Sequence, residues 1–162
     1  MSVIWVSPES VIEESPWDYW NNKDNVKDED TGTYASMAVP SHQWSTYLLM
    51  IPEDELWCSK LRFWAQMIHN KIDQIKLKAY DTRGDIGWVE KIWDHYPSIQ
   101  WVEWDMGNIY YIENVEVSFY NSYGSTQTAR FHEFDFGNVA LAARPQVGGS
   151  LAGNILVGKG LA

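Results

Sequence analysis

Short runs in which apolar and more polar residues alternate are the feature that most constrains how this chain can fold. The three clearest runs place an apolar residue at every second position: Leu61, Phe63 and Ala65; Ile75, Leu77 and Ala79; Val115, Val117 and Phe119. Successive side chains of a β-strand point to opposite faces, so each run predicts a strand with one buried and one wetter face. No convincing helical periodicity lies between the runs. The pattern therefore predicts an all-β fold, an antiparallel β-sandwich, rather than alternating strands and helices.

Turn-forming residues divide the rest of the chain into further short strands. The additional strands are expected at residues 3–6, 34–39, 46–51, 87–93, 99–104 and 129–136. We expect a turn at Met106, Gly107 and Asn108, which separates the strand ending at Trp104 from the one that contains Val115. Together these strands predict one domain over residues 1–137.

The composition changes after Asn138, where aromatic residues cease and small residues become common. The segment 138–162 cannot bury much area alone, and a flexible tail is one interpretation of it. The other is an extended arm that packs on a neighbouring subunit, since a pure linker would not need large apolar residues. The residues that would make this contact are Leu151, Ile155, Leu156 and Val157. The arm interpretation predicts protein partners, as a homo-oligomer or a larger assembly.

Aromatic residues make up 15% of the chain, with 10 Trp, and they serve two purposes that the sequence does not separate. Most must fill the sandwich, but exposed Trp and Tyr rings are also platforms on which sugar rings stack. The densest group, Trp17, Tyr19 and Trp20, lies among Asp and Asn residues typical of a loop. We predict that these three, with Trp88, contact a glycan or another surface.

The charge and the missing motifs exclude several function classes. A net charge of −10 is the opposite of what nucleic-acid binding needs. No apolar run reaches membrane-spanning length, and the first residues lack the basic start and long apolar stretch of a secretion signal. Cys58 is the single cysteine, and the four His lie far apart without metal-ligand spacing. No nucleophile or phosphate-binding motif is present either. We therefore expect a non-enzymatic protein that neither binds nucleic acid nor inserts into a membrane.

Several segments in a fixed order resemble the galactose-binding-like jelly roll, the β-sandwich of discoidin (coagulation factor 5/8 C-type) domains and many carbohydrate-binding modules. The first is an acidic loop that ends in Thr33 and Tyr34, although Glu29 stands where glycine is commoner. The last is a closing strand that begins Ala129-Arg130. The resembling segments are residues 28–34, 45–50, 72–81, 87–89, 112–120 and 129–134. The resemblance implies the same sandwich and, for most members, no catalysis.

The resemblance also implies a structural Ca²⁺ between the early loop and the closing strand. Its ligands would be Asp28 and Asp30 with loop carbonyls including that of Thr33, and Glu133 from the far end of the chain. Calcium prefers such hard oxygen ligands. The alternation of apolar residues changes parity near Glu133, which predicts a β-bulge there. The alternative is a solvated acidic loop with Glu133 as an ordinary outward residue.

Two function classes follow. The first is a structural or adhesion subunit of a larger assembly, most plausibly a decoration or tail-associated protein of a phage virion. A lone jelly roll without disulfide or secretion signal, ending in an arm, favours this class. The second is a carbohydrate-binding module of a secreted or cell-surface glycan-processing system, which would be extracellular.

Overall fold

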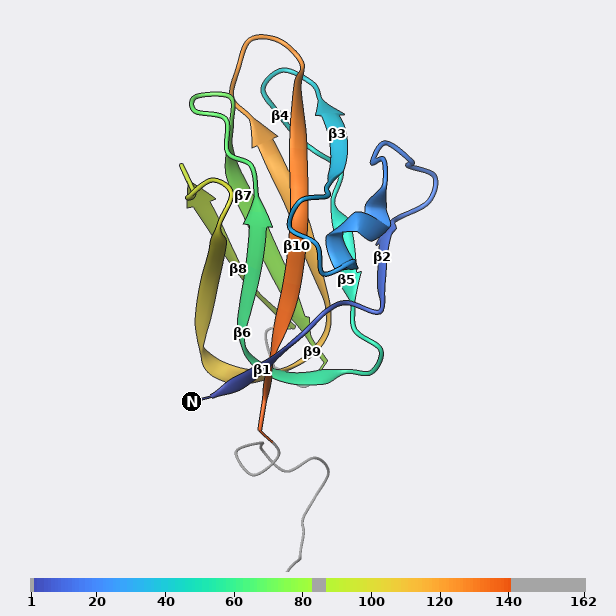
Figure 1. The fold of residues 1–162 in the computed structure, drawn as a ribbon, viewed down its shortest axis with the longest axis vertical. Helices are drawn as coiled ribbons and strands as arrows, with labels where there is room; N and C mark the ends of the chain where they lie inside the picture. The colour runs from blue at the N-terminus through green and yellow to red at the C-terminus, as the bar shows by residue number, and fades with distance from the viewer. Residues whose placement is uncertain (1, 83–86, 141–162) are drawn as a thin grey trace, which may run out of the picture.

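The computed structural model describes residues 2–82 and 87–140, which form an antiparallel β-structure with one short helical turn (Figure 1). The strands are β1 (Val3–Val6), β2 (Ser10–Glu13), β3 (Ala35–Val39), β4 (Gln43–Trp44), β5 (Leu48–Ile51), β6 (Leu56–Ala65), β7 (Ile72–Asp81), β8 (Trp88–Asp94), β9 (Trp101–Asn121) and β10 (Gln127–Val139). A 3₁₀ turn, η1 (Lys23–Lys27), lies between β2 and β3. The predicted all-β, antiparallel sandwich is confirmed.

The two layers of the sandwich are parts of one curled sheet, and the long strand β9 belongs to both. Its first half pairs with β6, which pairs with β10, and β10 also pairs with β1 and β3. Its second half pairs with β7, β5 and β4, while β8 and β2 lie outside β7 and β5. Figure 1 shows β9 sweeping round the lower end of the molecule from one layer to the other.

The core lies between the layers and is filled by the residues that the alternating runs predicted to face inward. Leu61, Phe63, Ile75, Leu77 and their counterparts on β9 are fully buried. Aromatic rings pack against one another in this core, most of them edge to face. The ring pairs include Phe63 with Trp93 and Tyr96, Phe119 with Trp20 and Phe131, and Phe134 with Phe136. Burial of apolar area on this scale is the main force that stabilises the sandwich.

The prediction of a turn at residues 106–108 is wrong, because β9 continues through these residues without a break. The pairing with β6 steps from Asp105 opposite Lys60 to Tyr110 opposite Cys58, so the residues between bulge out of the ladder. Gly107 has a φ of 76°, a conformation that glycine adopts readily. Its amide donates a hydrogen bond to the Asp105 carboxylate at 3.0 Å. Turn chemistry therefore produces a bulge that bends the strand rather than a reversal of the chain.

Strand β10 confirms the bulge that the sequence predicted near Glu133. Its register against β6 shifts between Phe131 and Glu133. The strand continues to Val139, which is buried and pairs with Val3, so the folded part extends past the boundary expected at residue 137. The four arm residues predicted to contact a neighbour, Leu151, Ile155, Leu156 and Val157, lie outside the described residues.

Two short strands, β2 and β4, and the turn η1 had no clear sequence signal. β2 and β4 are too short to show a period, and each is held by pairing with a neighbour, β2 with β5 and β4 with the long strand β9. In η1 a single apolar residue, Val26, is fully buried and anchors the segment. Among the described residues, no helix is long and apolar enough to cross a bilayer.

Candidate functional site

The aromatic group predicted to contact a glycan is divided by the fold. Trp17 and Tyr19 are exposed, at 45% and 57% of their surface, in the loop that follows β2. Trp20 is only 2% exposed and packs on Phe119, and its indole Nε1 donates to the carbonyl of Thr46 at 3.0 Å. The prediction that Trp20 contacts a ligand is therefore wrong. The reason is that its ring fills the core and its polar nitrogen already has a buried partner.

Tyr19 forms one side of a shallow surface groove of about 290 Å³. The groove is lined by the loop after β2 and by the segment from β3 through β4, and its lining contains both apolar and polar groups. The lining residues are Tyr19, Met37, Ala38, Pro40, Gln43, Trp44 and Thr46. A concave, largely apolar site with two aromatic rings and a few polar groups is the usual form of a small-ligand site.

Glu13, the last residue of β2, holds the loop that carries Tyr19. Its carboxylate accepts hydrogen bonds from the amides of Tyr19 and Trp20, each at 3.0 Å, and from the hydroxyl of Thr46 at 2.6 Å. The next residue, Trp20, is in turn anchored through its indole to the Thr46 carbonyl. The Tyr19 backbone is therefore fixed relative to the groove. A site fixed before the ligand arrives loses less conformational entropy on binding.

Trp44, the second aromatic residue of the groove, is held in place by neighbouring side chains. Its ring packs against Tyr120 with centroids 5.2 Å apart, and the ammonium of Lys76 lies 4.7 Å from its centroid. Sequence reasoning missed Trp44 and Glu13. The Gln43-Trp44 dipeptide is too short to show a strand period, and only the fold brings Glu13 to the loop. A Trp close after the turn-forming Pro40-Ser41 was the available signal for Trp44.

Trp88, the fourth residue predicted to contact a glycan, is exposed but does not line this groove. It begins the strand β8, and the ammonium of Lys78 lies 4.5 Å from its ring centroid. The structure therefore brings together Trp17 and Tyr19 in one loop and leaves Trp88 on a different strand.

The acidic loop and the middle of β10 meet, as the expected calcium site requires. The amide of Asp30 donates to the Glu133 carboxylate and to the Asp28 carboxylate, both at 3.0 Å. The Thr33 hydroxyl also donates to Asp28, at 2.5 Å. Residues more than 100 positions apart thus place three carboxylates around one loop.

The Asp28 and Glu133 carboxylates of this cluster lie close enough together to affect each other's protonation. Glu133 is 2% exposed, and its Oε1 atom is buried without a hydrogen-bond partner. Burial, together with the neighbouring Asp28 carboxylate, raises the pKa of Glu133 to about 8. Partial burial also raises the pKa of Asp28, but hydrogen bonds from the Thr33 hydroxyl and the Asp30 amide outweigh it and leave the pKa below its usual value. The unpartnered oxygen and the crowded carboxylates fit a cation with oxygen ligands.

A second cavity, of about 230 Å³, adjoins this loop on the outer face of β1, β10, β6 and β9. At its centre the Arg62 guanidinium lies between two indoles, 4.3 Å from the ring centroid of Trp5 and 3.9 Å from that of Trp101. The same guanidinium donates two hydrogen bonds to Asp135, at 2.9 and 2.7 Å. The inner indole faces are therefore occupied by Arg62, and this cavity is less suited to stacking a sugar than the groove at Tyr19.

Comparisons with known proteins give a consistent result for the fold. No protein-family model and no curated protein sequence matches the chain. Among solved structures, the C-terminal domain of a chitobiase from Bacteroides fragilis matches with a TM-score of 0.57 and 9% identity, over 84% of this chain and 98% of that chain. The family 32 carbohydrate-binding module of AlyQ, in complex with 4,5-unsaturated mannuronic acid, has a TM-score of 0.55 and 11% identity, over 82% and 97% of the two chains.

A third structure is the family 32 module of C. perfringens NanJ in complex with galactose, with a TM-score of 0.52 and 13% identity, over 78% of this chain and 90% of that chain. At these identities the likeness concerns the fold and not the ligand. In each case nearly the whole of the matched domain is covered, which agrees with the two-layered sandwich described above. The chain has the galactose-binding-like β-sandwich fold of the family 32 carbohydrate-binding domains.

Proposed function

We propose that this chain is a non-catalytic carbohydrate-binding module that holds a glycan in the groove between Tyr19 and Trp44. The observation that carries the proposal is a groove lined by two aromatic residues: Tyr19, exposed and with its backbone amide bonded to Glu13, and Trp44, whose ring packs on Tyr120. Sugar rings present apolar C–H faces that pack on such rings, while Gln43 and Thr46 supply hydrogen bonds to hydroxyls. Trp17, exposed in the same loop, extends the surface available to a longer glycan.

The fold supports this proposal by analogy, because two of the similar structures carry a sugar ligand in their own sites. We accordingly propose an extracellular location and a role beside glycan-processing enzymes. The other class of function, a subunit of a phage virion, has no support among the similar structures. It depends on arm residues that lie outside the described part of the chain.

The experiment is a glycan array followed by titration of the strongest ligand into wild-type protein and two variants. Tyr19→Ala removes the stacking ring without touching the core, and we expect binding to weaken by about tenfold or more. Tyr123→Ala is the matched control, since Tyr123 is similarly exposed, on the loop between β9 and β10, but is not among the residues that line the groove. Equal affinities of the Tyr19→Ala protein and wild type would place the glycan elsewhere. No bound glycan at all would end the proposal.

We further propose that a Ca²⁺ ion is held by the carboxylates of Asp28, Asp30 and Glu133 with oxygens of the loop that ends at Thr33. The support is the buried, unpartnered Oε1 atom of Glu133 and its raised pKa. When bound, the ion would supply the positive charge that these carboxylates lack and would tie the loop to β10. Its role is structural, because Tyr19 and the groove belong to a different loop.

A further inference from the structure

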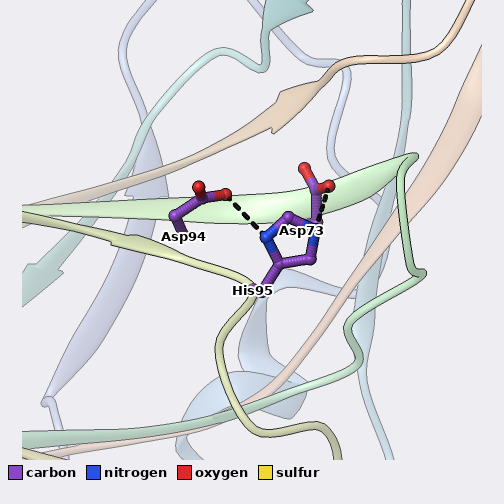
Figure 2. A group of neighbouring side chains, drawn as sticks. All are labelled: Asp73, Asp94 and His95. Atoms are coloured by element: carbon purple, nitrogen blue, oxygen red, sulfur yellow. Dashed lines mark ion pairs between the residues drawn. The ribbon is translucent and has the colours of Figure 1, made fainter.

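A second group of potential metal ligands lies where β8 ends beside the start of β7, and the proposed glycan and calcium sites do not include it. It consists of Asp73, Asp94 and His95, and one ligand atom from each lies within 4.8 Å of the others. Figure 2 shows the ring of His95 between the two carboxylates. The spacing of histidines in the sequence did not reveal this group, because its members come from different strands.

The two nitrogens of His95 have different neighbours. Nδ1 lies 3.0 Å from Asp94 Oδ1, and Nε2 lies 3.2 Å from Asp73 Oδ2. A carboxylate that accepts the proton of one ring nitrogen fixes the tautomer, so that the lone pair is on the other nitrogen. Here Asp94, which is the more exposed carboxylate, would hold the proton on Nδ1. Nε2 would then direct its lone pair towards Asp73.

The separation between Nε2 and Asp73 suits two ligands of one ion. Bonds of about 2.0–2.2 Å to a tetrahedral Zn²⁺ place neighbouring ligand atoms about 3.3–3.5 Å apart. Asn70 Oδ1 lies 3.4 Å from the same Nε2 atom. The ring of His69 lies with its centroid 5.1 Å from that of His95, at the turn before β7. The Asp73 carboxylate and the Asn70 amide oxygen thus both lie near Nε2 of His95, and the His69 ring lies beside the His95 ring.

Asp73 is the member whose surroundings most need a cation. It is 4% exposed and lies at a register shift of β7 against β9, between Ile72 and Gln74. Apart from His95, the hydrogen-bond partner recorded for its carboxylate is the Ser122 hydroxyl at a long 3.4 Å. A buried carboxylate normally has stronger partners than this, because its desolvation is costly.

We propose that this cluster is a binding site for a divalent transition-metal ion such as Zn²⁺, with Asp73 and His95 Nε2 as its central ligands. His69 and Asn70 complete the coordination from the turn before β7, and Asp94 orients His95 by accepting the Nδ1 proton. Imidazole nitrogen selects zinc and its neighbours over Ca²⁺, which prefers an all-oxygen set. The ion would join the turn before β7 to the end of β8, where the backbone amide of His95 already donates to the Asp73 carbonyl at 2.7 Å.

The test uses ZnCl₂ as the probe, with excess Ca²⁺ present so that the loop at Glu133 does not compete. Isothermal titration and thermal melts are run on wild type, His95→Asn and His42→Asn. The two histidines are matched, because both are exposed and both have left-handed backbones, with φ of 54° and 56°, which asparagine tolerates. We expect one Zn²⁺ per chain and a higher melting temperature in wild type and His42→Asn. In His95→Asn the affinity should fall at least tenfold.

Three further variants test the other proposed ligands and the independence of this site from the acidic loop. Asp73→Asn removes the buried ligand, and His69→Gln, on the surface, tests the second imidazole if the Asp73 variant fails to fold. Glu133→Gln should leave Zn²⁺ binding unchanged, which separates this site from the acidic loop. The proposal is overturned if wild type shows no saturable Zn²⁺ binding up to millimolar concentration. It is equally overturned if His95→Asn binds as tightly as wild type.

Discussion

Glu133 shows at the scale of one residue how burial turns an ordinary carboxylate into a pH-dependent group. Its pKa is about 8 in the folded chain, against an ordinary value of 4.5. Between these two values the unfolded chain releases a proton that the folded chain keeps. The contribution of Glu133 to folding stability is therefore present below about pH 4.5, declines as pH rises, and is lost above about pH 8.

Substitution Glu133→Gln should remove this dependence. The glutamine side chain is uncharged at every pH, and its oxygen can still accept a hydrogen bond from the Asp30 amide. In chelator at pH 9 we expect the variant to be more stable than wild type by a free energy of unfolding on the order of a few kcal/mol. Its melting temperature should be correspondingly higher. Added Ca²⁺ should reverse the order, because mass action stabilises only the chain with a complete ligand set.

Thermal melts at pH 5, 7 and 9, with Ca²⁺ and with chelator, measure both effects. Glu103→Gln is the control, since it removes one negative charge from an exposed position of β9. A wild-type melting temperature that is the same with Ca²⁺ and with chelator would refute the calcium site. A difference between wild type and Glu133→Gln that does not change with pH would refute the raised pKa.

At the scale of elements, the contact between β10 and β6 depends on a residue without a side chain. A Cβ atom added at Gly137 would lie 2.7 Å from the carbonyl oxygen of Lys60 and 3.0 Å from its Cβ. The pairing of the two strands is irregular at the next residue, Asn138. Since the colliding atom belongs to the backbone, the strands themselves would have to separate.

We therefore expect Gly137→Ala to destabilise the domain by about 1–3 kcal/mol, as overpacking does elsewhere. Gly124→Ala is the matched control, because a Cβ there meets nothing within 4 Å and its φ is not positive. Urea unfolding of the two variants and wild type gives the comparison. A Gly137→Ala protein as stable as wild type would show that β6 and β10 can move apart at no cost.

At the scale of the whole molecule, the open question is what residues 138–162 do. β10 ends at Val139, so a shortened chain that ends at Ala140 keeps the strand intact. We expect this chain to melt within about 2 °C of the full protein, because it keeps every core residue of the described part of the chain. If the segment is an arm, the native mass should fall from that of an oligomer to that of a monomer. Replacement of Leu151, Ile155, Leu156 and Val157 by serine in the full chain should have the same effect on mass. Equal native masses for the full and shortened chains would rule out the arm.

The sequence by itself determined the class of fold and most of its strands. Alternation is a local property, and it correctly predicted the buried faces of β6, β7 and the second half of β9. The change of parity near Glu133 likewise predicted the bulge in β10. The conformation of residues 106–108 could not be predicted from local sequence, because a glycine there is compatible with both a chain reversal and a β-bulge. Pairing with β6 decided between them.

The tertiary structure alone decided which side chains are available to a ligand. Trp17, Tyr19 and Trp20 look alike in the sequence, but burial against Phe119 takes Trp20 into the core and leaves the other two at the surface. Trp44 and Tyr19 line one groove although 25 positions separate them, and the metal-ligating group at His95 is likewise assembled from separate strands. The physical reason is common to all three cases. Periodicity reports which way a side chain points from its own strand, whereas a site depends on which strands lie beside it, and that is set by long-range pairing and packing.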